Sequence, residues 1–193
     1  MLSYKESLKI LKETNALLEG HFILSSGLHS DKYVQCAQLL SKPKEAKNIC
    51  NSLAEKIKEN FKKIDLILSP AIGGIVIGYE IGRILNVETI FAERSKEGFD
   101  LRRGFKIKKG QNILVVEDVI TTGKSSLECS NLAIKAGGQI TGYACIIDRS
   151  NGKSSIKNKI VSQIQIQIPT YKKENLPKNL MSIKAIKPGS RKI

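Results

Sequence analysis

The chain has few aromatic residues and no long apolar run, features on which many binding proteins depend. It contains no tryptophan, and aromatic residues make up 5% of its 193 residues, with no pattern of aromatic residues between basic ones. No apolar run approaches the roughly 20 residues of a membrane helix. The first residues alternate charged and apolar types, unlike the continuous apolar region of a signal peptide. We therefore expect a cytoplasmic protein without a membrane partner.

Cysteines are few and far apart. The four are Cys36, Cys50, Cys129 and Cys145, and no two form a CxxC pair. Cys50 and Cys129 fall in helical patterns and Cys145 in a strand pattern. This placement favours buried thiols over metal ligands or disulfides.

Acidic residues are also in the minority, at 18 against 32 lysines and arginines, for a net charge of +14. Such a surplus suits either a nucleic-acid or membrane surface, or a solvated surface around a site for small anions. Most of the basic residues are lysines scattered along predicted helices, which favours the second interpretation. We do not expect nucleic acid as a partner, and the positive field would help gather polyanionic substrates.

The length suits one α/β domain with a full core, residues 1–193. No internal repeat or low-complexity linker divides it. We expect an N-terminal segment over 1–40, an α/β core over 41–168 and a tail over 169–193.

The N-terminal segment predicts a helix over 3–18, because Ser3 and Glu6 make a capping box and apolar residues follow at helical spacing. Gly20 would end that helix. Two short strands are expected at 21–24 and 32–36. Pro43 then begins an amphipathic helix that we expect to reach residue 61.

The core pattern alternates strands and helices. We expect strands at 65–69, 87–92, 113–117, 140–147 and 160–168, helices at 75–85 and 126–136, and a polar loop over 93–110. Continuously apolar strands in βαβ order predict a parallel sheet covered on both faces, with 160–168 as an edge or late strand. Ligands of such sheets bind at the carboxyl ends of the strands.

One run at such a strand end carries most of the chemistry. After the apolar strand come two carboxylates, Glu117 and Asp118, then a turn of hydroxyls, a glycine and a lysine over 121–125, then a helix. Backbone N–H groups at the turn and helix start bind phosphate oxygens, and the carboxylates can accept hydrogen bonds from ribose hydroxyls. A Walker loop is excluded because Asp118 stands where its first glycine is required. An ordinary strand–turn–helix remains the plain alternative.

The run resembles the phosphoribosyl pyrophosphate (PRPP) signature of the type I phosphoribosyltransferases. The resemblance implies that family's fold, a mostly parallel central sheet flanked by helices with an N-terminal hood. It also implies Mg²⁺ carried by PRPP near Asp118, with no direct protein ligand, and a homodimer. The implied PRPP-binding residues are Glu117, Asp118, Val119, Ile120, Thr121, Thr122, Gly123, Lys124, Ser125 and Arg94.

Two further segments fit this family. A glycine turn after an earlier strand, by itself as much a plain turn as a site, resembles its pyrophosphate loop, with residues Ala71, Ile72, Gly73 and Gly74; the family carries a non-proline cis peptide there. The charged segment that follows is a solvated hairpin by composition. The resemblance implies instead a mobile loop over 94–105, shared across subunits, with Arg94, Arg102 and Arg103 as catalytic residues beside Glu117 and Asp118. The lysines and histidine common in that loop are missing here, so their roles are not transferred.

The choice of base depends on two segments. Residues 20–33 follow Gly-x-Phe-x-Leu-x-Ser-Gly and then Ser-x-x-Tyr, similar to the hood of the orotate phosphoribosyltransferases. Arg149 follows the last core strand. A lone arginine at a strand end is usually a surface residue. The resemblance implies instead that Arg149, together with Thr121, binds orotate. The resemblance thus implies transfer from PRPP to orotate, in pyrimidine biosynthesis. A purine phosphoribosyltransferase and a non-catalytic RNA-binding regulator on the same fold remain alternatives.

Overall fold

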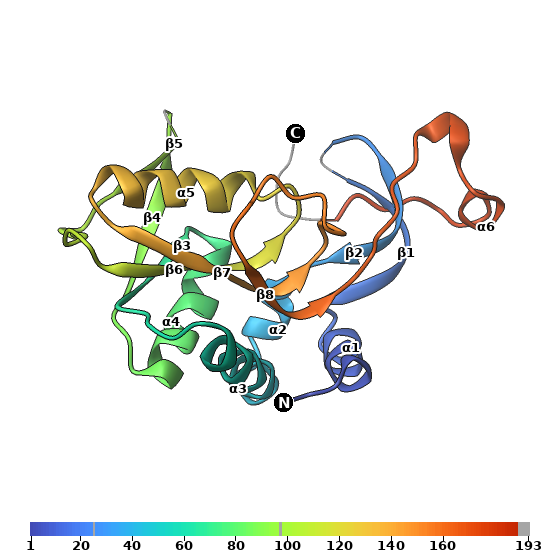
Figure 1. The fold of residues 1–193 in the computed structure, drawn as a ribbon. Helices are drawn as coiled ribbons and strands as arrows, with labels where there is room; N and C mark the ends of the chain where they lie inside the picture. Colours follow the sequence, from blue (N-terminus) through green and yellow to red (C-terminus); the bar gives the residue numbers. More distant parts are fainter. Residues whose placement is uncertain (25, 97, 189–193) are drawn as a thin grey trace.

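The structure, a computed structural model, describes residues 1–24, 26–96 and 98–188. Ser25 of the predicted hood, Glu97 of the predicted mobile loop and the last five residues of the predicted tail lie outside the described residues. A central sheet carries helices on both faces, and a two-stranded hood stands at one end (Figure 1).

The central sheet has six strands in the order β5-β4-β3-β6-β7-β8. All neighbours pair in parallel except β4 and β5, which are antiparallel. The strands are β3 (Leu66–Pro70), β4 (Thr89–Ser95), β5 (Gly98–Leu101), β6 (Asn112–Ile120), β7 (Gln139–Asp148) and β8 (Ile160–Gln165). The parallel βαβ pattern read from the sequence is confirmed, and β8 is an edge strand as predicted.

Helices bury both faces of this sheet. Helices α3 (Pro43–Asn60) and α4 (Gly73–Leu85) lie on one face, and α5 (Lys124–Lys135) lies on the other (Figure 1). Each face has its own apolar cluster, one built on α3 and α4 and one on α5. This two-sided cover explains why the strand residues are apolar without alternation.

The predicted N-terminal helix was too long. The capping box of Ser3 and Glu6 is present, but α1 covers only Tyr4–Glu13, and the chain reverses at Asn15 with φ of 59°. Leu17 and Leu18 continue the helical spacing but belong to β1 (Leu17–Ile23), so Gly20 lies within a strand instead of ending a helix. The pairing of this segment with β2 (His29–Val34) therefore determines its structure, although its apolar residues have helical spacing.

Several other elements differ from the prediction. The segment expected as a polar loop over 93–110 forms in part a hairpin, because β4 runs on to Ser95 and pairs with β5. A short helix, α2 (Cys36–Leu40), follows β2 where no helix was expected. Helix α3 ends one residue before the predicted bound.

The tail lies against the hood. After β8 it forms a 3-10 turn, η1 (Lys173–Asn175), and a short helix, α6 (Lys178–Met181). It makes isolated β-bridges to the hood, Tyr171 with His29 and Ile186 with Phe22. Segments far apart in the sequence are therefore joined at this end of the molecule (Figure 1).

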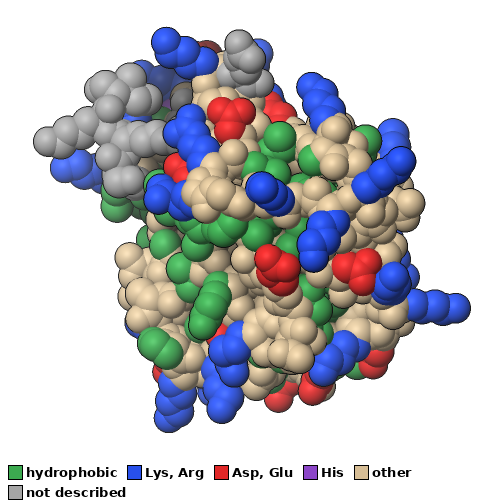
Figure 2. Space-filling view, turned by 90° about the vertical axis from the view of Figure 1, so that its left-hand side faces the viewer, with side chains coloured by type: hydrophobic (Ala, Val, Ile, Leu, Met, Phe, Trp, Pro, Cys, Tyr) green, Lys and Arg blue, Asp and Glu red, His purple; other side chains and the backbone are tan. Residues whose placement is uncertain are grey.

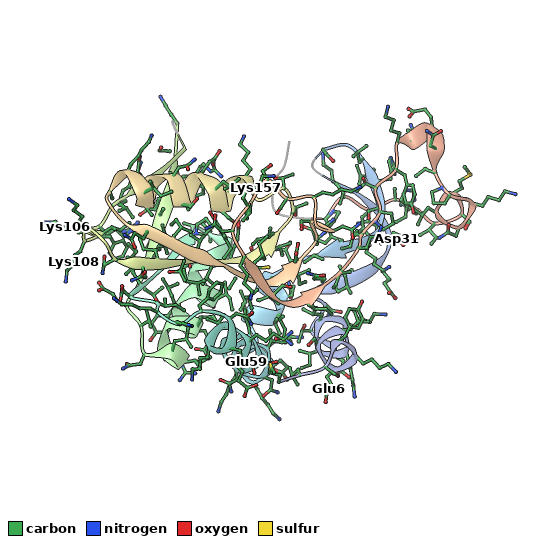
Figure 3. All side chains as sticks on the ribbon, viewed as in Figure 1. Glu6, Asp31, Glu59, Lys106, Lys108 and Lys157 are labelled. Carbon is green, nitrogen blue, oxygen red and sulfur yellow. The ribbon has the colours of Figure 1, made fainter. Side chains whose placement is uncertain are left out.

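The cysteines agree with the prediction of buried thiols. All four cysteines are free and buried. On the face shown in Figure 2, lysines and arginines are dispersed among acidic and apolar side chains. Lys106 and Lys108 project outward at the end opposite the hood (Figure 3). Among the described residues, no helix has the length and apolar character needed to cross a membrane.

Candidate active site

The acidic pair lies at the carboxyl end of β6, in the middle of the sheet. Asp118 Oδ1 accepts a hydrogen bond from the N–H of Val119 at 2.9 Å. Burial raises the pKa of the Asp118 carboxyl, and the hydrogen bond only partly opposes this. The side chain is thus held half-buried at the strand end, where it can meet a bound ligand.

The pKa of Glu117 is raised as well. Burial raises its pKa from 4.5 to about 7, the negative charge of Asp118 adds to the effect, and the hydroxyl of Ser126 opposes it by donating a hydrogen bond. The positive charge of Arg94 also opposes the rise. A carboxyl with a pKa near neutrality in a strand-end site is typical of functional positions.

The hydroxyl-rich turn follows β6 and leads into α5. Gly123 has φ of 80°, a conformation that favours glycine, and it precedes the first helical residue. The turn lines a small pocket of about 180 Å³ whose lining residues are Glu117, Val119, Thr121, Thr122, Gly123, Lys124 and Ser125. The N-terminus of this three-turn helix gives the pocket a positive potential suited to a phosphate.

The loop that contains Ser155 and Ile156 packs against this turn. The N–H of Ser155 donates to the carbonyl of Thr122 at 3.0 Å. A side chain at Gly123 would place its Cβ 2.8 Å from Cγ1 of Ile156. The backbone of the turn is therefore packed and hydrogen-bonded, not merely exposed.

The second glycine turn lies beside the acidic pair. A Cβ at Gly73 would lie 3.0 Å from both carboxylate oxygens of Asp118, so only glycine leaves that space open. The peptide bond between Ala71 and Ile72 is cis, and the N–H of Ala71 donates to the carbonyl of Ala92 at 2.8 Å. The two turns predicted separately from the sequence thus meet at one sheet edge.

Arg94 reaches from β4 to the start of α5. Its guanidinium pairs with Glu128, donates to Oγ of Ser125 at 3.3 Å, and lies 4.0 Å above the ring of Phe99. Lys124 also faces Glu128, with 3.9 Å between Nζ and Oε1. Two cations next to the hydroxyl-rich turn therefore share one counter-ion.

Arg102 and Arg103 stay on the hairpin. Arg103 Nε donates to Oε1 of Glu93 at 2.7 Å, and Arg102 lies 4.0 Å from Oε2 of the same carboxylate and 3.6 Å from Asp100. Arg102 lines an open pocket of about 610 Å³ together with Arg94, Ser95, Lys96 and Asp100. In this structure Arg103 is not brought to the acidic pair.

Arg149 stands at the end of β7, next to β6. Its N–H donates to the carbonyl of Ile120 at 2.8 Å. Its side-chain Nε is buried and has no hydrogen-bond partner among the described residues. Burial lowers the pKa of this guanidinium, and the charges of Cys36 and Tyr33 partly oppose the shift. An arginine donor left open in this position is suited to an anionic group of a ligand.

Comparison with known proteins agrees with this geometry. A family model described as "Phosphoribosyl transferase domain" matches residues 36–177. The chain is 47% identical to an orotate phosphoribosyltransferase of Parvibaculum lavamentivorans, over 96% of this chain and 97% of the relative. The chain belongs to the orotate phosphoribosyltransferase family.

A second relative supports this assignment, and a solved structure shows the same fold. An orotate phosphoribosyltransferase of Rhizorhabdus wittichii is 45% identical over 93% of this chain and 92% of its own length. The solved orotate phosphoribosyltransferase of Aeropyrum pernix superposes with a TM-score of 0.72 at 23% identity, covering 82% of this chain and 92% of that one. The structural likeness shows the shared fold, and the full-length sequence identity shows the family.

Several residues that contribute to the site were not predicted from the sequence. Ser126 holds Glu117, Glu128 holds Arg94 and Lys124, and Ile156 packs under Gly123. The spacing of Lys124 and Glu128, four residues apart on a helix, could have indicated that pair. The contact of Ile156 has no local signal because it comes from a loop more than thirty residues away in the sequence.

Proposed function

We propose that the protein transfers the 5-phosphoribosyl group from PRPP to orotate, yielding orotidine 5′-monophosphate and pyrophosphate in pyrimidine biosynthesis. The observation that carries the proposal is the meeting of the acidic pair, the two turns and the open guanidinium of Arg149 at adjacent strand ends. Family membership over nearly the whole chain favours orotate over a purine base.

The turn after β6 binds the 5′-phosphate in this proposal. Backbone N–H groups of residues 121–125 and the hydroxyls of the two threonines and Ser125 donate to its oxygens, aided by the α5 N-terminus. Lys124 adds a positive charge at the rim of the same pocket. The packing of Ile156 against Gly123 keeps this cradle preformed.

Glu117 and Asp118 hold the ribose hydroxyls. Their negative charges also favour the positive charge that builds up on the sugar when the bond to pyrophosphate breaks. Both carboxyls have raised pKa values because they are buried. Hydrogen bonds from the ribose and a nearby cation would therefore favour their ionised form in the complex.

Orotate lies against Arg149 and Thr121. The guanidinium pairs with its carboxylate and fixes the ring, so that N1 faces the anomeric carbon of PRPP. The bond from N1 to the anomeric carbon forms as the bond to pyrophosphate breaks, and the N1 proton passes to the departing pyrophosphate or to water. This assigns the guanidinium of Arg149, whose buried Nε has no hydrogen-bond partner among the described residues, to the base.

Pyrophosphate leaves toward the second glycine turn and the hairpin. The backbone of residues 71–74 can approach it closely because Gly73 carries no side chain. Arg94, with Arg102 and Arg103, stabilises the departing charge once the 94–105 segment closes over it, which also excludes water. In the described arrangement Arg94 is paired with Glu128, so closure exchanges one anionic partner for another.

Mg²⁺ is the metal we assign to the reaction. Carboxylate and phosphate oxygens are the donors it prefers. The described residues contain no group of three His, Cys, Asp or Glu side chains able to hold an ion by themselves. The carboxylate of Asp118 is a donor of the type that Mg²⁺ prefers, so it suits an ion that arrives with PRPP and lies near it. When bound, it would neutralise the pyrophosphate leaving group.

A homodimer and a cytoplasmic location complete the proposal. Ile72, Val76 and Tyr79 are 86%, 51% and 66% exposed along α4, starting from the second glycine turn. Such a stripe beside the site suits burial against a second copy of the chain. In this proposal the 94–105 segment of one subunit reaches the partner's site.

The test follows orotate by its absorbance in the presence of PRPP and Mg²⁺. Asp118→Asn should lower kcat/KM at least about a hundredfold, and Arg149→Ala should raise the orotate KM at least about tenfold. Lys108→Ala, at the opposite end of the molecule (Figure 3), is the control and should match the wild type.

Three outcomes would overturn these assignments. Full activity of Asp118→Asn removes the ribose assignment, and an unchanged orotate KM in Arg149→Ala removes the orotate assignment. Turnover of adenine or hypoxanthine in place of orotate would favour the purine alternative. An RNA-binding regulator would consume no PRPP and would bind RNA with steep salt dependence.

A further inference from the structure

The tail holds the hood through backbone bonds on both of its strands. The carbonyl and N–H of Tyr171 both bond to His29 at 2.8 Å. Ile186 donates to the carbonyl of His21 and accepts from the N–H of Ile23, each at 2.8 Å. Ser30 Oγ donates to the carbonyl of Pro169 at 2.9 Å. The hood is thus a four-segment structure, of which the tail supplies two.

A pair of buried histidines joins the same parts through side chains. His21 and His29 are 5% and 7% exposed. Nδ1 of His21 lies 2.8 Å from the carbonyl oxygen of Ile183 in the tail, and Nε2 of His21 lies 2.6 Å from Nδ1 of His29. Neither ring takes part in the proposed reaction, and neither is explained by packing alone.

The partners determine where the protons are. A carbonyl oxygen only accepts, so Nδ1 of His21 carries a proton and donates it. In the neutral tautomer Nε2 of His21 then accepts from Nδ1–H of His29. The result is a directed chain of hydrogen bonds, from His29 to His21 to Ile183, that crosses both hood strands and ends in the tail.

The hood is tied to the active site at its other end. The ring of Phe22 in β1 packs on Tyr33 in β2, with 5.8 Å between centroids. Tyr33 Oη donates to Oε1 of Gln35 at 2.8 Å, and the next residue, Cys36, lies with Sγ 3.9 Å from the carbonyl oxygen of Asp118. Strand β2 therefore leads from the histidine pair to Tyr33, whose charge acts on the Arg149 guanidinium, and then to α2, whose first residue contacts the backbone of Asp118.

We propose that His21 and His29, with the tail carbonyl of Ile183, are positioning residues that fix the hood over the base end of the active site. The C-terminal tail thereby sets the affinity for orotate without touching the reacting atoms. The phosphate end lies on the sheet and α5, outside this chain of contacts. The inference rests on the proposed function, because it assigns the hood to the orotate side.

The test compares two substitutions at one position. His29→Leu removes the donor that faces His21, whereas His29→Asn keeps a side-chain N–H near the place of Nδ1. We expect His29→Leu to raise the orotate KM about tenfold, the loss expected for one hydrogen bond of about 1.4 kcal/mol. The PRPP KM should stay within about twofold, and His29→Asn should recover most of the orotate affinity.

Equal changes in both KM values, or an unchanged orotate KM in His29→Leu, would overturn the inference. A wild type that consumes no orotate would instead overturn the proposed function, so the two failures are distinguishable. A second measurement needs no variant: the chain has two histidines, so ¹⁵N NMR of histidine-labelled protein resolves their tautomers. Both rings should carry the proton on Nδ1, and an Nε2–H tautomer of His21 would also overturn the inference.

Discussion

At the scale of single residues, the site depends on where carboxyls are buried. Glu117 and Asp118 are adjacent in the sequence, but their surroundings differ. Asp118 accepts from a backbone N–H, whereas Glu117 has the hydroxyl of Ser126. Burial outweighs these hydrogen bonds in both, so both pKa values rise. The free protein therefore keeps ligand-binding charges in a place where they lower its stability.

The loss of stability caused by ionisation of Glu117 should be measurable. A pKa raised from 4.5 to about 7 means that the folded state binds the proton more tightly, so the contribution of this group to stability is present below pH 4.5 and lost as pH rises through 7. Glu117→Gln should then raise the free energy of unfolding by up to about 3 kcal/mol at pH 8. Urea unfolding of both proteins measures the difference.

The pH dependence is the control for this prediction. The gain from Glu117→Gln should shrink to near zero at pH 4.5, where the native carboxyl is protonated and resembles the amide. Ser126 can bond to either side chain, so the hydrogen bond is not lost. A gain that is the same at both pH values would mean that the effect is not titration of Glu117.

At the scale of elements, the site depends on how closely α4 approaches the sheet. Added Cβ atoms would lie 2.0 Å from Oγ of Ser69 at Gly78 and 1.9 Å from Oγ1 of Thr89 at Gly82. These glycines let the helix lie directly on β3 and β4, which brings its first turn to Asp118. The sequence predicted this helix within two residues, but the glycines in it could not be assigned a role without the partner strands.

A double-mutant cycle tests this close approach. Gly78→Ala should lower the free energy of unfolding by about 1–3 kcal/mol, because overpacking exceeds the gain in helix propensity. Ser69→Ala removes the clashing hydroxyl, which is buried without a partner among the described residues, and should be near neutral by itself. Thermal and urea unfolding of the four proteins give the coupling energy.

The double variant of Gly78→Ala and Ser69→Ala tests whether α4 contacts Ser69 at this position. It should recover much of the loss, with a coupling above about 0.5 kcal/mol. If Gly78→Ala is as stable as the wild type, or if the two effects simply add, then α4 does not rest on Ser69 as described. Activity measured beside stability would show whether movement of α4 also disturbs the glycine turn.

At the scale of the whole molecule, charge and exposed apolar area raise the question of partners. Lysines on the viewed face are dispersed, which suits a solvated surface (Figure 2). The stripe of Ile72, Val76 and Tyr79 is different because its members follow one another at helical spacing from the second glycine turn along α4 and lie beside the site. It is the surface on which the proposed homodimer can be tested.

Val76→Glu should convert a dimer to a monomer, because it buries an unpaired charge in the interface. The matched control is Ile134→Glu on α5, where the wild-type side chain is 55% exposed against 51% at Val76. Sedimentation or light scattering at equal concentration gives the mass. A wild type that is monomeric, or a Val76→Glu protein that stays dimeric, would contradict this interface.

Sequence by itself determined the parts whose cause is local. Strand, acidic pair, turn and helix start over 113–125 are consecutive, so their order alone predicted a phosphate and ribose site. Helix α3 was predicted because Pro43 and a continuous apolar face lie within it. These features need no knowledge of distant residues.

Tertiary structure decided what depends on residues far apart in the chain. The end of α1 was set by pairing of β1 with β2, and the pKa of Glu117 by burial under neighbours from other elements. The open guanidinium of Arg149, the contact of Gly73 with Asp118 and the histidine chain to the tail likewise arise only when distant segments meet. Local sequence carries propensity and chemistry, whereas burial and proximity are properties of the folded chain.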